Sequence, residues 1–468
     1  MLCSTVFGRY PKTSVEQVFN MIQSDGWMVP FAGHKMVVNI DNSGVAREVY
    51  YSTKLNKIVM VVNNIIYLIN SSLIATRVAS IDTYTGDVFI DENEANQIAI
   101  SDKKNIYILN TVSNVFQKAV IGFIPGYLCF QDGYFICADV GTNQWQLSNL
   151  NNGLIWLGAG NTVGLLQTKP DNVVATVRLP GHGNHLLVMG GTVTELWVDV
   201  GYKLFPYQRS SGINIDYGCL NPATIASGDE FVVWLGINEK SGPVIMVSTG
   251  GETKRISNDG IDFKLAALTN PSYAYGFIYK QDGHLFYQIT FPDPEDNLTL
   301  LYDFNTQKFF TLCDEYMDYH IAKRIVYFNN SYYFISFKDG NLYELNTKYT
   351  QYDGEEIPRV IVSDTIRLPD SSPFIVNNIT FTMEQGMPEP DLSDPPSSVT
   401  IPRVDVSFSI DGGTSFSNYF GMDLNKVTNK RNRLIKWGFG RCNEFIPQFR
   451  FWNAGRMLVK DGIVSIYQ

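Results

Sequence analysis

The sequence contains few of the residues on which enzyme mechanisms usually depend. Its 468 residues include only five histidines and six cysteines. It has no Gly-Lys-[Ser/Thr] phosphate-binding loop, no His-Glu-x-x-His zinc motif and no Gly-x-Ser-x-Gly nucleophile elbow. These absences exclude the common nucleotide-binding, metalloprotease and hydrolase signatures. We therefore assign no catalytic residue, no metal site and no cofactor.

Long helices and long apolar runs are also missing. The 38 glycines and 20 prolines interrupt the chain too often for long helices, and only residues 14–23 have a short helical pattern. No apolar run reaches the roughly 18 residues of a membrane helix, and the best one, 58–69, is broken by Asn63-Asn64. The N-terminus lacks a signal-peptide pattern. We expect a soluble protein made in a cytosol.

Positive charge is scarce and unevenly placed. The net charge is −10, which argues against a nucleic-acid-binding surface over the whole protein. Residues 401–468 contain 10 Lys and Arg against 5 Asp and Glu, a balance of +5, which leaves −15 for residues 1–400. The contrast has two interpretations: chance variation between domains, or an acidic body with a basic docking face.

What the sequence does contain is a repeated β-hairpin. Apolar and aromatic runs flank tight turns whose residues adopt the positive φ angles of two-residue hairpin loops. The turns are Asn63-Asn64, Asp132-Gly133, Gly190-Gly191, Asp282-Gly283 and Asn329-Asn330. Many flanking strands are apolar on both faces, as in stacked sheets. Repetition of one β unit predicts an all-β fold built around an irregular β-propeller.

The hairpins also suggest the domain organisation. Centres near 63, 103, 132, 190, 282 and 330 predict about six blades, and a seventh hairpin passes near 250–251. We expect an irregular N-terminal lead-in over 1–40, a propeller over 41–354 and a smaller C-terminal β-sandwich over 355–468. A proline-rich acidic stretch at 386–398 cannot pair in a sheet and predicts a disordered loop.

Other candidate sites have simpler interpretations. Cys129 and Cys137 flank one hairpin turn, but its register places them on opposite faces, so all six cysteines are expected to be buried and unbonded. His182 and His185 lack a nearby third ligand and are taken as turn residues. The acidic residues around Pro294 fit a solvated loop better than a weak calcium site.

A turn motif stands near the C-terminus. Ser409, Asp411, Gly413 and Phe416 resemble the Asp-box of sialidase-like propellers, with Ser415 where threonine is usual. In that box the aspartate binds backbone amides of a hairpin, so its role is structural and not catalytic. A glycosidase would also need a pair of carboxylates at one pocket, and the sequence marks no such pair.

Several short segments, in order along most of the chain, resemble one known family. The segments are 18–21, 26–33, 195–197, 408–416, 429–431, 434–441 and 448–451. They resemble the packaged-DNA stabilisation protein, or tail hub, of short-tailed bacteriophages, of the Salmonella-phage type. Ala32, inserted before Gly33, and the 386–398 loop depart from the family pattern.

The resemblance implies a non-enzymatic structural protein of the virion tail, assembled in the bacterial host cytoplasm. It implies a homo-oligomer, taken as a hexamer, below the portal and its adaptor ring. There the protein would extend the tail channel, help to retain packaged DNA, and anchor a needle or plug and tailspikes or fibres. DNA would pass through the channel without sequence-specific binding. The alternative is a propeller-type carbohydrate-binding protein or sialidase-like glycosidase.

Two hypotheses concern the charges. An acidic lumen would repel the DNA backbone and let it slide. A basic set at the C-terminal end would dock on an acidic adaptor or neighbouring subunit, although a solvated basic rim fits the same residues. The set comprises Lys430, Arg431, Arg433, Lys436 and Arg441.

Overall fold

The structure, a computed structural model, describes residues 3–9, 16–156, 163–203, 205–250, 252–385, 403–423, 431–452 and 457–467. Within these ranges nearly all regular structure is strand. The single α-helix found there, α1 (Asp259–Ala266), and the 3-10 helices η1 (Pro222–Thr224) and η2 (Pro271–Tyr273) lie in connections between strands. The expected all-β fold is confirmed.

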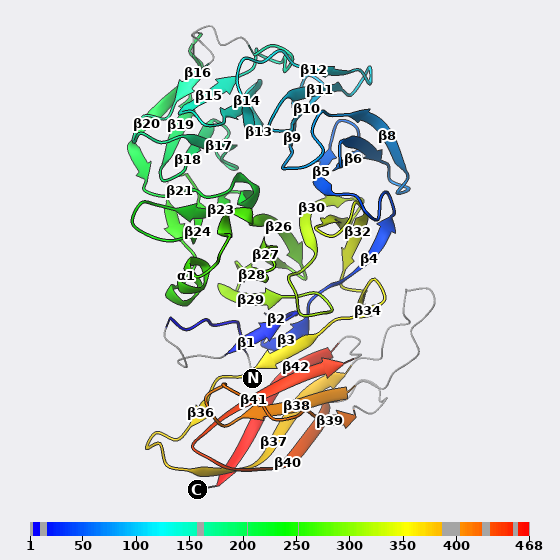
Figure 1. Ribbon diagram of the computed structural model, residues 1–468, viewed down its shortest axis with the longest axis vertical. Helices are drawn as coiled ribbons and strands as arrows, with labels where there is room; N and C mark the ends of the chain where they lie inside the picture. The colour runs from blue at the N-terminus through cyan, green and yellow to red at the C-terminus, as the bar shows by residue number, and fades with distance from the viewer. Residues whose placement is uncertain are drawn as a thin grey trace.

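Seven antiparallel blades form a ring in the described part of the chain (Figure 1). The first three blades are β5 (Ala46–Ser52), β6 (Lys57–Val62), β7 (Ile65–Ile69) and β8 (Ala75–Ser80); β9 (Phe89–Glu92), β10 (Gln97–Ser101), β11 (Ile106–Asn110) and β12 (Phe116–Lys118); and β13 (Pro125–Gln131), β14 (Tyr134–Asp139), β15 (Gln144–Leu147) and β16 (Val163–Leu165).

The next two blades are β17 (Val173–Arg178), β18 (His185–Gly190), β19 (Thr194–Asp199) and β20 (Tyr207–Ile215); and β21 (Gly218–Cys219) with β22 (Ala226–Ser227), β23 (Val232–Ile237), β24 (Val244–Ser248) and β25 (Thr253–Arg255). The last two are β26 (Tyr275–Gln281), β27 (His284–Phe291), β28 (Leu298–Asp303) and β29 (Lys308–Leu312); and β30 (Ala322–Phe328), β31 (Ser331–Ser336), β32 (Leu342–Asn346) and β4 (Gly33–Val38).

The ring therefore holds one blade more than the six that the hairpin centres predict. The additional blade is the fifth. Its innermost strand is split into β21 and β22 by η1, and residues 238–243 replace a two-residue turn between β23 and β24. The repeated pattern of an apolar run, a tight turn and a second apolar run is therefore absent between β23 and β24, although the strands still form a sheet.

Apolar packing between neighbouring blades holds the ring together. Separate clusters of buried side chains lie between successive blades, from the seventh and first to the fifth and sixth. Between the first two blades, for example, Val59, Val61 and Ile66 pack with Ile98 and Ile100. Each fully buried side chain of this size stabilises the fold by roughly 1.5–3 kcal/mol, more than a surface ion pair does.

Three of the five predicted turns have positive φ at both positions, whereas at Asn63-Asn64 only Asn63 does, and at Gly190-Gly191 neither residue does, so that prediction is wrong there. Asp132 and Gly133 have φ angles of 49° and 85°, and Asp282 and Gly283 have angles of 49° and 82°. Asn329-Asn330 is positive at both positions as well. These angles match the twist of the flanking strands and are the reason for Asn, Asp and Gly at these sites. All six cysteines are buried and unbonded, as expected.

The N-terminal lead-in is not irregular and contains no helix over its described part. It forms β1 (Gln17–Phe19), β2 (Met21–Ser24), β3 (Trp27–Pro30) and β4. The helix predicted over 14–23 is wrong for residues 16–23, because the backbone of β1 pairs with β29 and β35 and that of β2 pairs with β3. Residues 14 and 15 lie outside the described residues. Residues 16–38 are called the N-terminal clasp below.

The clasp closes the ring. Strand β4 pairs with β32, so the seventh blade combines strands from two distant parts of the chain. Lys35 lies opposite Glu344 and Met36 lies opposite Tyr343. The innermost strand of this blade, β30, contacts β5 of the first blade.

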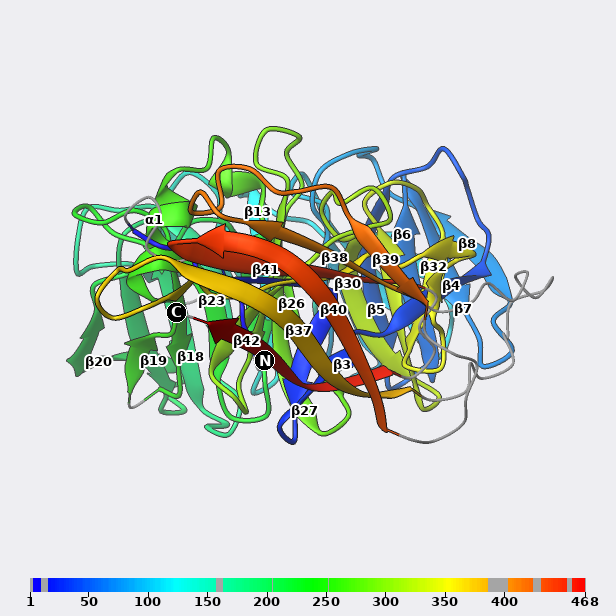
Figure 2. The same cartoon turned by 90° about the horizontal axis from the view of Figure 1, so that it is seen from below.

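A C-terminal β-sandwich follows the propeller, as the sequence predicts. Its first sheet contains β35 (Arg359–Val362), β36 (Ile366–Arg367), β38 (Arg403–Ser409), β39 (Phe420–Asp423) and β41 (Glu444–Trp452). Its second contains β37 (Phe374–Gln385), β40 (Arg431–Cys442) and β42 (Met457–Tyr467), extended by β3 and β2. Seen from below, this sandwich lies in front of the ring (Figure 2). A short hairpin of β33 (Gln351–Tyr352) and β34 (Glu355–Glu356) precedes it.

The clasp also joins the two bodies. Strand β1 pairs with β29 of the sixth blade and with β35 of the sandwich, so one sheet runs from the propeller into the sandwich. Met28 of β3 pairs with Val459 of β42 in the other sandwich sheet. One apolar core spans the junction, including Phe310 of the propeller, Met21 of the clasp and Phe449 of the sandwich.

Candidate interaction surfaces

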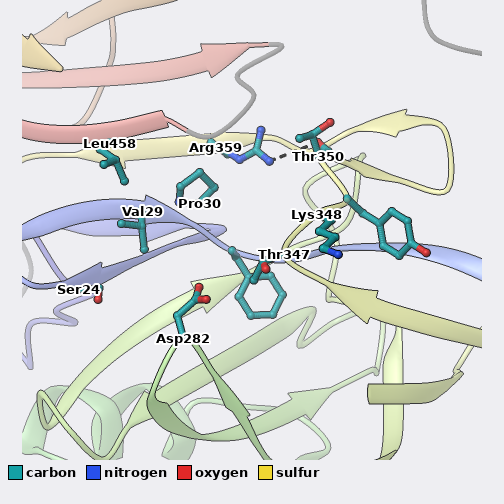
Figure 3. Close-up of a pocket in the computed structure, with 11 residues that line it drawn as sticks. Ser24, Val29, Pro30, Asp282, Thr347, Lys348, Thr350, Arg359 and Leu458 are labelled. Carbon is teal, nitrogen blue, oxygen red and sulfur yellow. Dashed lines mark hydrogen bonds between the residues drawn. The ribbon is translucent and has the colours of Figure 1, made fainter. Parts of the chain in front are cut away.

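A cavity of about 320 Å³ lies where the propeller, clasp and sandwich meet (Figure 3). Val29 and Pro30 line it from the clasp, Leu458 from the sandwich and Asp282 from a propeller hairpin. Arg359 is 2% exposed and donates from Nη2 to the Thr350 carbonyl at 3.3 Å. Burial lowers the pKa of this guanidinium to about 10. The wall mixes single polar groups with apolar ones, an arrangement suited to packing.

A buried aromatic cluster supports the ring closure beside this cavity. The His34 ring of β4 stacks on Tyr352 at 4.5 Å and meets His320 edge-on at 5.9 Å. Burial lowers the pKa of His34 well below its usual value and lowers that of His320 to about 3. Both imidazoles are therefore neutral near pH 7. In the described chain no three His, Cys, Asp or Glu side chains gather as a metal site.

The propeller axis has its own opening, of about 220 Å³, between innermost strands. Glu48 is the one carboxylate among the described residues that line it, and its Oε2 lies 3.4 Å from Nε of Arg324. Arg324 also donates to the Gly276 carbonyl at 2.7 Å. A glycosidase needs two carboxylates at one site. The axial lining supplies one, held in an ion pair.

Four of the five predicted basic residues belong to strand β40. Lys430 is outside the described residues, as is the whole 386–398 loop. Arg431, Arg433 and Lys436 belong to β40, and Arg441 at its far end is exposed. The structure thus places four of the five positions on one edge strand of the sandwich.

Strand β40 and its neighbours β37 and β42 also carry an apolar face, which the sequence analysis did not predict. Trp437 is 58% exposed and Tyr467 is 61% exposed, and Ile375 and Ile435 are also exposed. Register explains the grouping, because Ile375 of β37 lies opposite both Arg441 and Tyr467. The sequence contains one signal for this apolar face, which is a row of aromatic and branched apolar residues within a basic segment.

The Asp-box-like turn is tied by its own side chains. Asp411 Oδ1 accepts from the Thr414 and Ser415 amides, each at 3.0 Å, and from the Ser409 hydroxyl at 2.7 Å. The Ser409 oxygen accepts from the Gly413 amide, and Phe416 is 37% exposed. Hydrogen bonds from Ser415 hold the pKa of Asp411 well below its usual value. This geometry is that of a hairpin lock.

Two propeller connections form an acidic surface. Residues 292–297 and 313–318 contain six carboxylates and no basic residue. Asp296 accepts from the Thr269 and Asn270 amides, at 2.6 and 2.9 Å. Asn297 Nδ2 donates to Asp318 at 2.7 Å and joins the two connections. The acids around Pro294 thus order loops of the propeller.

Comparison with known families identifies the class. Residues 7–350 match the family described as "Bacteriophage P22 Gp10, beta-propeller". The chain belongs to this family, and it is a phage structural protein with a β-propeller fold. The matched range covers the clasp and all seven blades, and the resemblance stated from the sequence is confirmed.

Solved propellers show only distant likeness. Streptogramin B lyase is 12% identical with a TM-score of 0.46, over 69% of this chain and 99% of that chain. A catalytically inactive virginiamycin B lyase from Staphylococcus aureus, solved with quinupristin, is 12% identical with a TM-score of 0.45, over 67% and 99%. The N-terminal domain of Nup159 is 10% identical with a TM-score of 0.42, over 70% and 98%. These values carry no inference about activity.

A search of curated protein sequences found no match to the chain. Among the helices of the described ranges, none has the length and apolar character needed to cross a membrane.

Proposed function

We propose that this protein is a hub subunit of a short phage tail. It lies below the portal and adaptor ring as a ring-shaped homo-oligomer, taken as a hexamer, extends the tail channel and helps to retain packaged DNA. In the virion it anchors a needle or plug and tailspikes or fibres, after assembly in the host cytoplasm. It acts as a building block without catalysis or a cofactor.

The observation that carries this proposal is the family match together with the joined architecture. A component that stays in place against internal DNA pressure needs domains that do not separate. Here a continuous sheet and a shared apolar core fix the propeller to the sandwich. The net charge of −10 suits a channel component through which DNA passes without adhering.

A virion experiment tests the proposal. In the phage that encodes this protein, a nonsense mutation in its gene should give heads that package DNA and then lose it. Particles would be counted as full or empty by electron microscopy, and supplying the protein from a plasmid should restore full particles. Particles that retain DNA and infectivity without the protein would contradict the hub role.

A further inference from the structure

The outer face of the second sandwich sheet is built like a protein interface. We define this outer sandwich face as Ile375, Ile435, Trp437, Arg441 and Tyr467, all exposed. Large exposed apolar groups gathered on one face mark interaction sites. Tryptophan, tyrosine and arginine are also the side chains that contribute most to binding at interface centres.

Strand geometry makes this face accessible at the sheet edge. Strand β40 is the last strand of its sheet, so within the described ranges no further strand pairs with its outer side. Gly438 and Gly440 have φ angles of 85° and 86°, and a Cβ at either would meet nothing within 4 Å. Such kinks prevent regular pairing of a further strand there. Side-chain docking is therefore favoured over the addition of a strand.

The positive charge around this face favours an acidic partner. Residues 401–468 carry a balance of +5, and Arg441 of β40 is an exposed cation on this face. In the connections 292–297 and 313–318, Glu295 and Asp318 are exposed and Asp293 and Glu315 are half-buried, whereas Asp296 and Asp314 are buried and Asp314 pairs with Lys338 at 2.7 Å. These connections also present exposed apolar groups, because Tyr316 is 74% exposed and Met317 is 39% exposed. Charge and apolar character are thus complementary between the two surfaces.

We infer that the outer sandwich face of one copy docks on the acidic surface of 292–297 and 313–318 of a second copy. Both surfaces are exposed in the single chain, so neither covers the other. They are different surfaces, and a contact between them is heterologous, which closes into a ring or extends as a filament. This inference rests on the proposed function and assigns the surfaces through which its subunits join.

Native mass spectrometry and sedimentation of the purified full chain test the inference. Trp437→Ser should raise the concentration needed for assembly by about 10-fold or more, since it removes a central anchor. Tyr202→Ser removes an equally exposed aromatic residue from a different connection, 200–206, and should assemble like wild type. Circular dichroism checks that both variants stay folded.

A charge exchange gives the sharper result. Arg441→Glu and Glu295→Lys should each weaken assembly, and the double variant should recover most of the loss. Higher salt should weaken the wild-type assembly and have less effect on Trp437→Ser. Recovery in the double variant requires the two residues to meet across the interface.

Three outcomes would overturn the inference. Wild-type assembly by Trp437→Ser would remove the face from the subunit contact and leave the hub proposal intact. A wild-type chain that stays monomeric would assign the face to another protein, and the hub role would still be judged on virions. Salt-sensitive binding of duplex DNA that Arg441→Glu abolishes, without any effect on assembly, would assign the face to nucleic acid.

Discussion

The side chain of Asn20 is bonded to both backbone groups of Cys313. Its Oδ1 accepts from the Cys313 amide at 3.0 Å, and its Nδ2 donates to the Cys313 carbonyl at 3.1 Å. The same Nδ2 donates to the Pro358 carbonyl at 3.0 Å, just before the sandwich begins. Asn20 is fully buried and has a φ of 53°. One side chain thus connects the clasp, the sixth blade and the start of β35.

Replacing Asn20 should therefore destabilise the junction. Asn20→Gly tolerates the left-handed backbone and removes the side-chain hydrogen bonds, including one to Cys313 Sγ at 3.1 Å, which leaves buried Cys313 and Pro358 groups without this partner. We expect a loss of about 2–4 kcal/mol in the free energy of unfolding, measured by urea titration. Asn56, exposed and with a φ of 49°, gives the control. Asn56→Gly should change stability little, and equal effects of the two variants would contradict the assigned role.

Ring closure should depend on the absence of a side chain at Gly33. A Cβ there would collide with the backbone carbonyls of Gln351 and Tyr349. Gly33→Ala should cost about 1–3 kcal/mol, seen as a lower thermal midpoint, because backbone must shift. Gly212→Ala has open space and an ordinary φ, so it should be close to neutral. A neutral Gly33→Ala would show that β4 has room to move.

The buried histidines predict acid sensitivity. The folded chain keeps His320 neutral down to about pH 3, whereas an unfolded imidazole takes up a proton near pH 6.5. The unfolded state therefore binds more protons in this window, and the free energy of unfolding should fall as pH falls from 6.5 towards 3. The slope is about 1.4 kcal/mol per pH unit for each such group.

A variant isolates this contribution. His34→Phe keeps a ring against Tyr352 and removes one titrating group, so urea midpoints should fall less steeply between pH 6.5 and 4. His182, exposed in a turn, provides the control, and His182→Gln should follow the wild-type profile. Parallel profiles for His34→Phe and wild type would assign the acid sensitivity to other groups.

The Asp-box-like turn should be a local structural element. Asp411→Ala removes the acceptor of the Thr414 and Ser415 amides, and hydrogen exchange should become faster at these positions. Asp370, which holds the exposed turn to Ser372, allows a matched comparison. Asp370→Ala should affect exchange near 372 and leave 414–415 unchanged. Unchanged exchange after Asp411→Ala would mean that the hairpin is held by its strands alone.

Much of the propeller could be predicted because its information is local. Asp132-Gly133 and Asp282-Gly283 fix their turns by backbone conformation alone, and the apolar runs beside them show burial on both faces. The fifth blade was marked only by the hairpin near 250–251, between β24 and β25, because its other connections use longer segments in place of such turns. Its buried Trp234 and Leu235 were visible only as an apolar run.

The clasp and the outer sandwich face could not be predicted for a different reason. Their structure depends on pairs that lie far apart in sequence, such as Phe19 with Thr311 and Met28 with Val459. No local pattern encodes such partners. The sequence alone likewise does not decide whether Trp437 is buried or exposed, because that depends on the register of β40 against β37.

The position of the clasp has a consequence for how the chain is made on the ribosome. Residues 16–38 leave the ribosome early. Strand β4 can pair with β32, and β3 with β42 near the other end of the chain, only after those later strands have been synthesised. Neither the circle of blades nor the attached sandwich is complete until those late strands have been synthesised. Incomplete chains thus lack a finished shape, which delays any association of copies until translation has ended.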